Sequence, residues 1–470
     1  MILFINPHPH YGVLGDLAAK EPPIWALMLA SQAKDAGIPV EILDAHALGL
    51  SPEDCAEKIQ TIKPKLVAIV VYGQNPSAST QLMPYVIELC KLLKDIKVLL
   101  VGGHVAVLPE LSLKQTGADY VCDSEGFSSI VQLYCSKDLN EVPNLVYMKD
   151  GKVIETSNVP LVKDLDKTVP EIYWDLADIS NSRPHNWLGL DPQWKDKPYV
   201  SIYTSLGCPY DCAFCCIQAP FRKSEAFELT KSYRTWSPEW AIKQLDNLVD
   251  KYGPVNLKIS DELFVFHREH VEKICDYLID RDYKLNIWAY ARLNYVPQDL
   301  LIKMKRAGIN WLAVGIESAN NRVRGDADKR LNKTSMLEGI KKIKDAGIYL
   351  QGNYMFGLPE DDMETMKETL EFAKEINAEW SVFNITMPFP GSKLYENYKT
   401  NTDWESYNYY GEKAKPLDTK HITGRKVMEF RDKAFIDYYS NKNYQDMIVQ
   451  KFGDGALATV KEMLSIDFKR

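Results

Sequence analysis

The first 135 residues alternate between short apolar runs and longer stretches with helical spacing of apolar positions, such as Ile24–Ala36 and Pro84–Leu93. Strands that are apolar at every position are buried on both faces, which is typical of a parallel sheet covered by helices. The pattern predicts a doubly wound, Rossmann-like or flavodoxin-like domain over residues 1–138. Its strands are expected at Ile2–Asn6, Val40–Leu43, Leu66–Val71, Val98–Val101 and Tyr120–Cys122.

Residues 139–197 follow a different pattern. Asn144–Thr156 predicts a hairpin that turns at Lys149–Gly151. The stretch after the hairpin is rich in Pro, Asp and Trp and has poor periodicity. We interpret residues 139–197 as a strap that connects two domains.

Residues 198–392 again alternate between strand-like and helix-like segments. Six predicted strands are joined by five predicted helices, whereas a full eight-stranded barrel typically needs about 250 residues. We therefore expect a partial (β/α)6 barrel of the TIM type over residues 198–395. A small, mostly helical region over 396–470 is expected to cap its opening. The predicted barrel strands are Val200–Ser205, Asn256–Ser260, Asn286–Tyr290, Trp311–Val314, Tyr349–Met355 and Trp380–Thr386.

Composition narrows the class of protein. A chain of 470 residues with 46% hydrophobic residues is large enough for two or three domains with cores. The net charge is −8 and no block of Lys and Arg stands out, which argues against nucleic-acid or membrane-surface partners. The first residues lack the pattern of a signal peptide, and no apolar run reaches the roughly 18 residues of a spanning helix. A cytoplasmic location is the expectation.

The cysteines supply the first candidate chemistry. Nine cysteines, an odd number in a large chain without a secretion signal, argue against a disulfide scaffold. Four of them lie within nine residues, directly after the first predicted barrel strand, where this fold carries its chemistry. Cys208, Cys212 and Cys215 are spaced C-x3-C-x2-C. An iron–sulfur cubane normally takes four thiolates, so three ligands leave one iron open to an external molecule.

Two other kinds of cysteine site fit less well. Zinc sites usually combine two C-x2-C pairs, or one pair with histidines, and no second half is present. A thioredoxin-like pair explains Cys212 and Cys215 but leaves Cys208 unexplained. Cys216 fits a buried neighbour better than a fourth ligand, because adjacent residues rarely point at one metal, and its role stays open.

The cysteine spacing, with Phe214 before the last cysteine, resembles the signature of the radical SAM superfamily. Five later segments resemble that family in the same order, each at the end of a predicted strand: Lys258–Glu262, Trp288–Arg292, Val314–Ser318, Gly352–Glu360 and Pro388–Tyr395. The resemblance implies a [4Fe-4S] cluster on Cys208, Cys212 and Cys215, with S-adenosylmethionine (SAM) bound to the open iron. Reductive cleavage of SAM then gives a 5′-deoxyadenosyl radical that abstracts hydrogen from the substrate.

The same resemblance assigns the SAM contacts by position. The expected contacts are the Phe214 backbone at the adenine, Asp261 or Glu262 at the ammonium, Arg292 at the carboxylate as a fork-shaped partner, Glu317 and Ser318 at the ribose hydroxyls, and Gly315 beside them.

The loops at the strand ends of the N-terminal domain resemble the cobalamin-binding domain that precedes the barrel in one large subgroup of this family. Gly102 and Gly103 let the backbone approach a bulky ligand closely. The dinucleotide fingerprint is absent, which disfavours an NAD site. A docking domain without a ligand is the alternative. The expected cobalamin contacts are Tyr72, Gln74, Asn75, Ser77, Gly102, Gly103, His104, Glu125 and Gly126.

The lower axial ligand of cobalt is left open. Asp44–Gly49 matches the D-x-H-x2-G pattern, but it follows the second predicted strand instead of the first, so a surface turn is expected at His46. His8 and His10 lie in the first loop without that pattern. If no histidine coordinates cobalt, its lower face is expected to meet the loop after the third strand, residues 72–77.

The resemblance implies a cobalamin-dependent radical SAM methyltransferase, which moves a methyl group from methylcobalamin to an unactivated carbon of a small molecule. Such an enzyme needs an electron donor, such as flavodoxin or ferredoxin. Three alternatives stay open. They are a related cyclase, oxidoreductase or rearrangement enzyme without methyl transfer, a methylthiotransferase, and a non-catalytic cobalamin or iron–sulfur binding protein. The scattered N-terminal cysteines lack the spacing that methylthio transfer requires.

Overall fold

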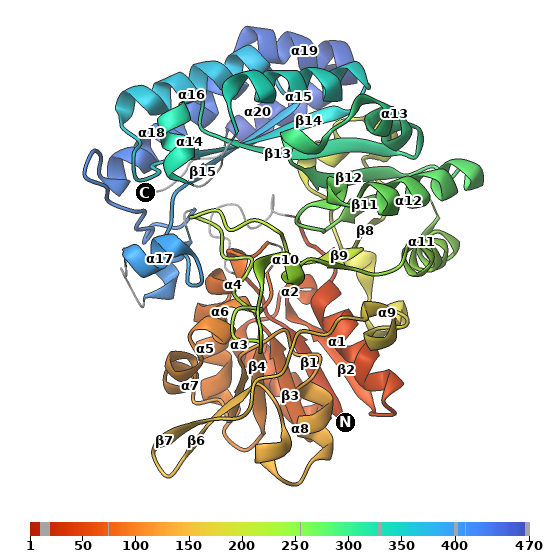
Figure 1. Ribbon diagram of the computed structural model, residues 1–470, viewed down its shortest axis with the longest axis vertical. Coiled ribbons are helices and arrows are strands. Elements are labelled where there is room, and N and C mark those ends of the chain that lie inside the picture. Colours follow the sequence, from red (N-terminus) through yellow and green to blue (C-terminus); the bar gives the residue numbers. More distant parts are fainter. Residues whose placement is uncertain are drawn as a thin grey trace.

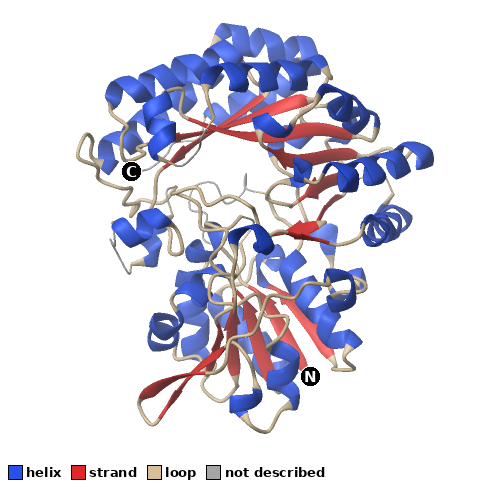
Figure 2. Cartoon of the chain, in the orientation of Figure 1, coloured by secondary structure: helices blue, strands red, loops and turns tan. Residues whose placement is uncertain are grey.

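In the computed structural model, the described residues are 1–9, 19–73, 75–253, 255–327, 331–398, 403–408 and 410–465. Two bodies, each built on a sheet, lie one above the other in Figure 1, with the N-terminal one at the bottom. Figure 2 shows the two sheets separated by a layer rich in loops. The described part of the chain contains no helix long and apolar enough to cross a membrane.

The N-terminal sheet contains seven strands in the order β2-β1-β3-β4-β5-β6-β7. The first five are parallel and follow the flavodoxin-like order, in which the chain changes direction between β1 and β3. Helices α1 and α8 pack together, as do α3, α5 and α7. The predicted doubly wound sheet is confirmed, with strands β1 Ile2–Asn6, β2 Val40–Asp44, β3 Leu66–Val70, β4 Val98–Val101 and β5 Tyr120–Cys122.

The predicted hairpin forms, but it belongs to this sheet. Strands β6 (Leu145–Lys149) and β7 (Lys152–Glu155) continue the sheet antiparallel to β5. The sheet is therefore mixed instead of purely parallel, and the boundary predicted at residue 138 lies inside it. The pairing of Val121 with Val146 in the core shows why, since both are fully buried and extend the same apolar layer.

The second sheet is the partial barrel. Its six strands are all parallel and neighbour one another in the order β15-β14-β13-β12-β11-β8, so each successive strand adds to the same edge. The predicted partial (β/α)6 barrel is confirmed. The strands are β8 Tyr199–Ile202, β11 Asn256–Ile259, β12 Asn286–Ala291, β13 Ile309–Glu317, β14 Tyr349–Phe356 and β15 Trp380–Ile385, and a short antiparallel pair, β9 Ser205–Leu206 and β10 Arg234–Thr235, lies beside them.

Helices surround both sheets and form the C-terminal region. In the N-terminal half they are α1 Ile24–Asp35, α2 Ala45–Leu48, α3 Pro52–Ile62, α4 Ala78–Gln81, α5 Met83–Leu92, α6 Gly103–Val107, α7 Pro109–Thr116, α8 Ile130–Cys135 and α9 Leu165–Thr168. Around the barrel they are α10 Leu229–Ser232, α11 Pro238–Tyr252, α12 Arg268–Arg281, α13 Gln298–Arg306, α14 Asn321–Asp326, α15 Lys333–Asp345, α16 Met363–Ile376 and α17 Lys393–Asn397. The C-terminal helices are α18 Gly424–Tyr439, α19 Lys442–Phe452 and α20 Asp454–Leu464.

Local sequence explains where the barrel helices begin. Ser237 caps α11 by accepting a hydrogen bond from the Trp240 amide at 3.1 Å, and Pro238 occupies the first helical turn. Asp362 forms a capping box with Thr365 at the start of α16. These caps fix the point at which each strand-end loop becomes a helix, and therefore the length of the loops that carry the candidate site.

Candidate active site

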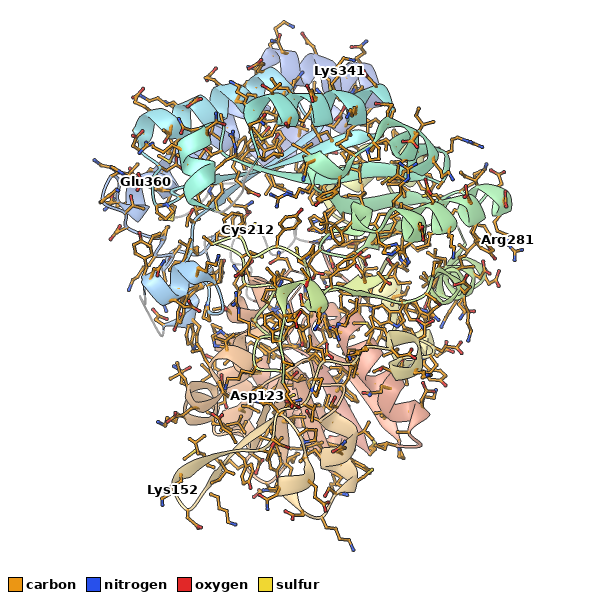
Figure 3. The ribbon with its side chains drawn as sticks, in the orientation of Figure 1. Asp123, Lys152, Cys212, Arg281, Lys341 and Glu360 are labelled. Atoms are coloured by element: carbon orange, nitrogen blue, oxygen red, sulfur yellow. The ribbon has the colours of Figure 1, made fainter. Side chains whose placement is uncertain are left out.

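The cluster motif lies between the two sheets, where Figure 3 labels Cys212. Cys208, Cys212 and Cys215 are half-buried free thiols on one loop. Burial raises the pKa of Cys215 well above its usual value, and the neighbouring Cys216, Cys212 and Cys208 raise it further. The three predicted ligands therefore lie within electrostatic reach of one another.

The three cysteine thiols are not grouped as ligands of a single metal ion. Among the described residues, no three His, Cys, Asp or Glu side chains are grouped so that they could hold one metal ion. A cubane places fewer demands on sulfur proximity, because each thiolate binds a different iron. Cys216 is buried, and burial raises its pKa to about 12, so it is a neutral neighbour of this group.

Asp261, at the end of β11, binds the start of the cluster loop through hydrogen bonds. Its carboxylate accepts hydrogen bonds from the Thr204 amide and hydroxyl, both at 2.6 Å, and from the Ser205 hydroxyl at 2.7 Å. Burial raises the pKa of Asp261 to about 6, although these bonds oppose the shift. Both carboxylate oxygens are thus engaged, and the structure gives Asp261 a role in positioning the loop.

Glu262 and Arg292 differ from Asp261, because each keeps a buried polar atom without a hydrogen-bond partner among the described residues. These atoms are Oε2 of Glu262 and Nε of Arg292. Burial raises the pKa of Glu262 to about 8. The Arg292 guanidinium lies 4.0 Å from the ring centre of Tyr210, a cluster-loop residue. An unpaired acceptor and an unpaired donor beside this loop fit the amino and carboxylate groups of an amino acid ligand.

The strand end of β13 is strained at Glu317. Its φ is +62°, which is uncommon for a residue other than glycine, and the β13–β14 register shifts between Gly315 and Glu317. Glu317 is nearly buried. Ser318 is fully buried, and its hydroxyl contacts the Thr369 hydroxyl at 3.1 Å and accepts the Asn320 amide at 3.1 Å. The bend therefore presents Glu317, while the Ser318 hydroxyl is engaged within the protein.

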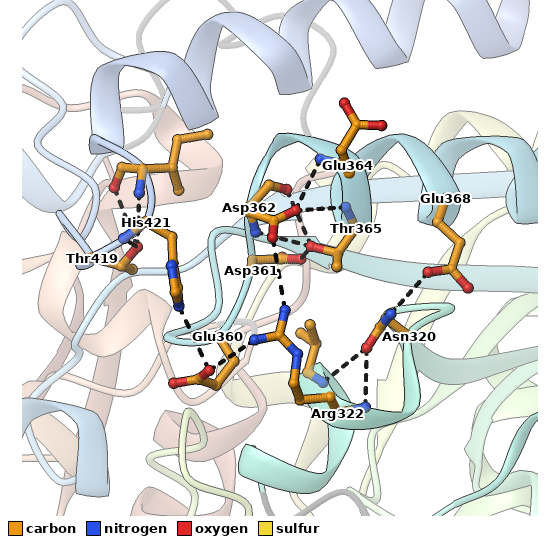
Figure 4. Close-up of polar contacts among 12 residues, drawn as sticks. Asn320, Arg322, Glu360, Asp361, Asp362, Glu364, Thr365, Glu368, Thr419 and His421 are labelled. Carbon is orange, nitrogen blue, oxygen red and sulfur yellow. Dashed lines mark hydrogen bonds and ion pairs between the residues drawn. The ribbon is translucent and has the colours of Figure 1, made fainter.

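Figure 4 shows how the loops after β13 and β14 are joined. Arg322, at the start of α14, donates to Glu360 at 3.0 Å and lies 3.7 Å from Asp362. His421, from the segment before α18, lies 3.6 Å from the same Glu360. Asp361 accepts the Gly357 amide at 3.0 Å, which closes the turn after β14. The C-terminal region thus fixes two of the strand-end loops.

A cavity of about 530 Å³ connects the cluster loop with the N-terminal domain. Phe214, Cys215 and Glu317 line it from the barrel side, and Asn75 and Ser77 line it from the loop after β3. We call it the central cavity. Most of its remaining wall comes from the strap, β12, β14, β15 and α18. One space therefore touches the predicted cluster, SAM and cobalamin loops.

The floor of the central cavity is aromatic. Trp187, from the strap, lies 5.2 Å from Trp288 on β12 and 5.4 Å from Trp380 on β15, measured between ring centres. His185 stacks on Trp187 at 4.2 Å. The strap therefore inserts a side chain between two barrel strands instead of only connecting the domains.

A buried ion pair lies beside this floor. Glu21 accepts hydrogen bonds from Lys258 at 2.7 and 3.0 Å and from Tyr199 at 3.2 Å, and the His185 ring nitrogen lies 3.2 Å away. Burial alone raises the pKa of Glu21, but the Lys258 charge and the His185 hydrogen bond lower it to about 2. The pair is internally neutral and joins the N-terminal domain, the strap and the barrel.

The predicted cobalamin residues divide into two groups. Asn75 and Ser77 line the central cavity, whereas Gln74 lies outside the described residues. Tyr72 stacks on Trp25 at 3.8 Å and donates to the Glu125 carbonyl at 3.3 Å.

The other predicted cobalamin residues make close protein contacts. Glu125 is paired with Arg234, and His104 contacts the Thr80 hydroxyl at 3.0 Å through Nδ1. A Cβ on Gly102 would lie 2.1 Å from the Val71 carbonyl oxygen, on Gly126 2.8 Å from a Val101 methyl, and on Gly103 3.4 Å from the Ser79 hydroxyl. The glycine after β4 is therefore required by the approach of two strand ends, whatever else binds there.

Cobalamin still fits this edge of the sheet. The loop after β3 lies at the point where the strand order reverses, the usual ligand position of open α/β sheets. Nε2 of the buried His104 has no hydrogen-bond partner among the described residues, and burial lowers the His104 pKa to about 3, so the ring stays neutral.

The prediction of a surface turn at His46 was wrong. His46 is buried on the short helix α2, its ring centre lies 5.5 Å from that of His8, and burial lowers its pKa to about 3. Asp44 caps this helix by accepting the Ala47 amide at 3.0 Å, which explains the turn-like sequence. His10 lies outside the described residues. Neither His8 nor His46, the two histidines of these loops that the structure describes, is singled out as an axial ligand.

Several cavity residues were not foreseen. Gln351, Asn353 and Met355 alternate along β14, and Arg431, Phe435 and Tyr439 recur every fourth residue along α18, so each set faces the cavity from one element. Large polar residues at alternate positions of an otherwise buried strand were the available signal, because such strands show one face to the barrel interior.

Comparison with known proteins supports both halves of this site. Residues 12–133 match the model of the B12 binding domain, and residues 202–373 match that of the Radical SAM superfamily. The solved structure of the radical SAM methyltransferase TsrM from Kitasatospora setae, with cobalamin and a [4Fe-4S] cluster bound, has the same fold. Its TM-score is 0.65 at 17% identity, over 84% of this chain and 73% of that one.

Two relatives match almost the whole chain. An uncharacterized methyltransferase of Pyrococcus horikoshii is 26% identical over 453 residues, which is 93% of this chain and 92% of the relative. The anaerobic magnesium-protoporphyrin IX monomethyl ester cyclase of Rubrivivax gelatinosus is 24% identical over 470 residues, 94% of this chain and 79% of the relative.

The domain matches define the cofactors as a [4Fe-4S] cluster, SAM and cobalamin. The cysteine loop and the loop after β3 of the N-terminal sheet both line one space between the two domains. The chain carries a B12-binding domain followed by a radical SAM domain, and it is a cobalamin-binding radical SAM enzyme.

Proposed function

We propose that this enzyme methylates an unactivated carbon atom of a small molecule. The observation that carries the proposal is the central cavity, which is lined both by Phe214 and Cys215 of the cluster loop and by Asn75 and Ser77 of the loop after β3. When bound, the three cofactors supply a hydrogen-abstracting 5′-deoxyadenosyl radical and a transferable methyl group. A substrate in this space contacts both sources.

In this proposal, the barrel residues hold SAM. The Glu262 carboxylate accepts from its amino group, and Arg292 binds its carboxylate through a guanidinium already oriented by Tyr210. Glu317, presented by the strained bend after β13, accepts from the ribose hydroxyls. Phe214 borders the adenine. Asp261 acts indirectly by fixing the start of the cluster loop.

The cavity wall favours a substrate with an extended apolar or aromatic body. Trp288 and Trp380 face it from the barrel, and Phe435 and Tyr439 face it from α18. Such walls exclude water from a radical, and they bind flat apolar surfaces well. Arg431, on the same face of α18, also lines this wall and is buried in an ion pair with Asp432 at 3.1 Å. We infer a small molecule instead of a nucleic acid.

The proposal includes a one-electron donor such as flavodoxin or ferredoxin, because reductive cleavage of SAM needs an external electron. It also assigns the enzyme to the cytoplasm. The nine cysteines are all free thiols in the structure, which suits a reducing compartment.

The proposal is tested by measuring the transfer of the SAM methyl group to cobalamin in the absence of substrate. The reconstituted protein, with cluster and reduced cobalamin, is incubated with SAM that carries a deuterated methyl group, and its cobalamin is analysed by mass spectrometry. We expect deuterated methylcobalamin. Formation of 5′-deoxyadenosine together with unlabelled cobalamin would contradict methyl transfer while preserving radical SAM chemistry.

A second candidate is cyclisation or another rearrangement without methyl transfer. The observation that favours it is the similarity to the Rubrivivax gelatinosus cyclase over almost the whole chain. The same labelling experiment separates the two, because a cyclase has no need to move the methyl group of SAM to cobalt.

A further inference from the structure

The end of β5 contacts the segment that follows the cluster loop at three successive residues. This strand end was expected to face cobalamin, yet its side chains reach toward the barrel instead. The contacts are Asp123 with Lys223 at 3.6 Å, Ser124 with Ser224 at 3.3 Å, and Glu125 with Arg234 at 2.8 Å. Three successive residues of the N-terminal domain therefore join it to the segment just after the cluster loop in sequence.

The strongest of these contacts is the pair of Glu125 and Arg234. Two guanidinium nitrogens donate to the two carboxylate oxygens at 3.1 and 2.8 Å, and both side chains are more than nine-tenths buried. Arg234 also donates to the Val162 carbonyl at 2.7 Å, and the Val162 amide donates back to Glu125 at 3.2 Å. A forked, fully bonded pair of this kind holds its two partners in one geometry.

The pair leads to the first cluster cysteine. Arg234 Nε donates to the Ser232 carbonyl at 3.2 Å. The Ser232 hydroxyl lies 3.3 Å from the Cys208 carbonyl oxygen and 2.8 Å from the Leu229 carbonyl oxygen, which share its single hydrogen. A Cβ on Gly207 would lie 2.2 Å from the Ser232 carbonyl oxygen, so the two backbones are in close contact there. A shift of Arg234 therefore moves the backbone that carries Cys208.

In the other direction, the pair leads to the loop after β3. The Tyr72 hydroxyl donates to the Glu125 carbonyl at 3.3 Å. Tyr72 begins the loop whose Asn75 and Ser77 line the central cavity. One continuous set of contacts thus runs from the N-terminal face of the cavity to the cluster loop.

We propose that Glu125 and Arg234 are positioning residues, which set the distance and orientation between cobalamin at the N-terminal strand ends and the cluster. The inference needs only that both cofactors bind, so it holds for methyl transfer and for cyclisation. Neither residue needs to touch a cofactor. Their effect arises because they fix the backbones of the two loops that do.

The test compares interspin coupling in the full-length holoenzyme. The cluster is reduced to its paramagnetic state, cobalamin is held as cob(II)alamin, and electron paramagnetic resonance reports the coupling between the two centres. In Glu125→Gln we expect full iron and cobalamin content but weaker or more widely distributed coupling. Transfer of the SAM methyl group to cobalamin should fall about tenfold or more, since misplacement of about 1 Å can cost that much.

Controls separate positioning from folding. Glu171→Gln removes an exposed pair between the strap and α11, with Lys243 at 2.8 Å, and should leave the coupling unchanged. If Glu125→Gln does not fold, the double variant Glu125→Gln/Arg234→Met keeps the test, because removal of both charges leaves no unpaired buried ion. Unchanged coupling in a loaded, folded Glu125→Gln or double variant overturns the proposal. A loss of methyl transfer alone, with unchanged coupling, overturns it too.

Discussion

The strand-end loops of the two domains, called here the barrel face and the N-terminal face, differ in how the protein itself engages the polar groups predicted to contact a ligand. On the barrel face, Glu262 and Arg292 keep buried polar atoms without hydrogen-bond partners among the described residues. On the N-terminal face, the Tyr72 hydroxyl and the Glu125 carboxylate are already bonded to protein groups, whereas Nε2 of His104 has no hydrogen-bond partner among the described residues. A buried polar atom without a partner costs about 1–3 kcal/mol, so the barrel face keeps such atoms at a cost in stability.

This difference indicates how strongly ligand binding is expected to depend on single side chains in each domain. In the function proposed above, each of a few side chains on the barrel face has one task, so a single substitution there is expected to remove a whole interaction. The N-terminal face is built from strand ends, close backbone contacts such as that of Gly102 with Val71, and loops that serve domain docking. We therefore expect a large ligand there to be held by many small contacts, so that a single substitution removes little.

The largest expected effect is that of Cys212→Ala. Loss of one of three thiolates should prevent a stable cluster, and SAM cleavage should fall by about 10³-fold or more, as when one member of a catalytic unit is removed. Iron content and 5′-deoxyadenosine formation are the measurements. Cys216→Ala is the matched control, and it should keep both, because Cys216 is a buried neutral thiol beside the ligand set. Loss of iron in Cys216→Ala alone would reverse these assignments.

The sequence predicts local features better than contacts between distant segments for a physical reason. Cys208, Cys212 and Cys215 act through their spacing on one loop, and spacing is a local property that a sequence displays. Apolar runs likewise predicted β1 and β4 at the bounds observed, because their buried positions are local in the sequence.

Interactions between distant segments were not predictable in this way. Glu125 was expected to contact cobalamin, but its ion pair with Arg234 joins residues 109 positions apart. The burial of His46 depends on its packing against His8, and the role of Trp187 in the cavity floor depends on two barrel strands. None of these relations leaves a periodic pattern in the sequence. They follow from how complete elements pack.

The second largest effect is expected for Asp261→Ala. Three hydrogen bonds to Thr204 and Ser205 are lost inside the protein, which should lower the free energy of unfolding by about 2–4 kcal/mol. Chemical denaturation measures it. Asp261→Asn should lose less, because the amide keeps one acceptor. Equal loss of SAM binding in both variants, with unchanged stability, would instead make Asp261 a direct SAM ligand.

Glu317→Gly separates ligand binding from stability. Removal of the carboxylate should weaken SAM binding about 10- to 100-fold, the range for hydrogen bonds to a charged group. Glycine adopts the φ of +62° at this position without strain, so the melting temperature should stay equal or rise. Equilibrium dialysis and thermal melts are the two measurements. A lower melting temperature with normal SAM affinity would mean that Glu317 is structural.

Glu262 should make SAM affinity depend on pH. Its pKa of about 8 means that the carboxyl is largely protonated at neutral pH before SAM binds. If the amino group of SAM donates to the ionised form, affinity should rise up to about tenfold per pH unit toward pH 8 and then level off. In the SAM-free protein, the raised pKa of Glu262 also makes the free energy of unfolding depend on pH. Its contribution is fully present below about pH 4.5, where the carboxyl is protonated in both the folded and the unfolded chain, and it is lost as pH rises through about 8.

Glu262→Gln is the control for the pH series. It removes the titrating carboxyl but keeps its size, so the difference between the two pH profiles isolates Glu262 from the titration of SAM itself. Parallel profiles in the two proteins would assign the SAM amino group to another acceptor.

The smallest effect is expected for Asn75→Ala, on the N-terminal face. Asn75 accepts from the Ser77 hydroxyl at 2.6 Å and from the Ala78 amide at 3.1 Å, so part of its polar capacity already shapes the loop after β3. If cobalamin is held by many small contacts, its affinity should fall only about threefold to tenfold, the value of one ordinary hydrogen bond. Cobalamin retained after gel filtration, across a concentration series, measures this change. A loss of 100-fold or more would show that one side chain dominates here as Glu317 is expected to on the barrel face, and the contrast between the two faces would then disappear.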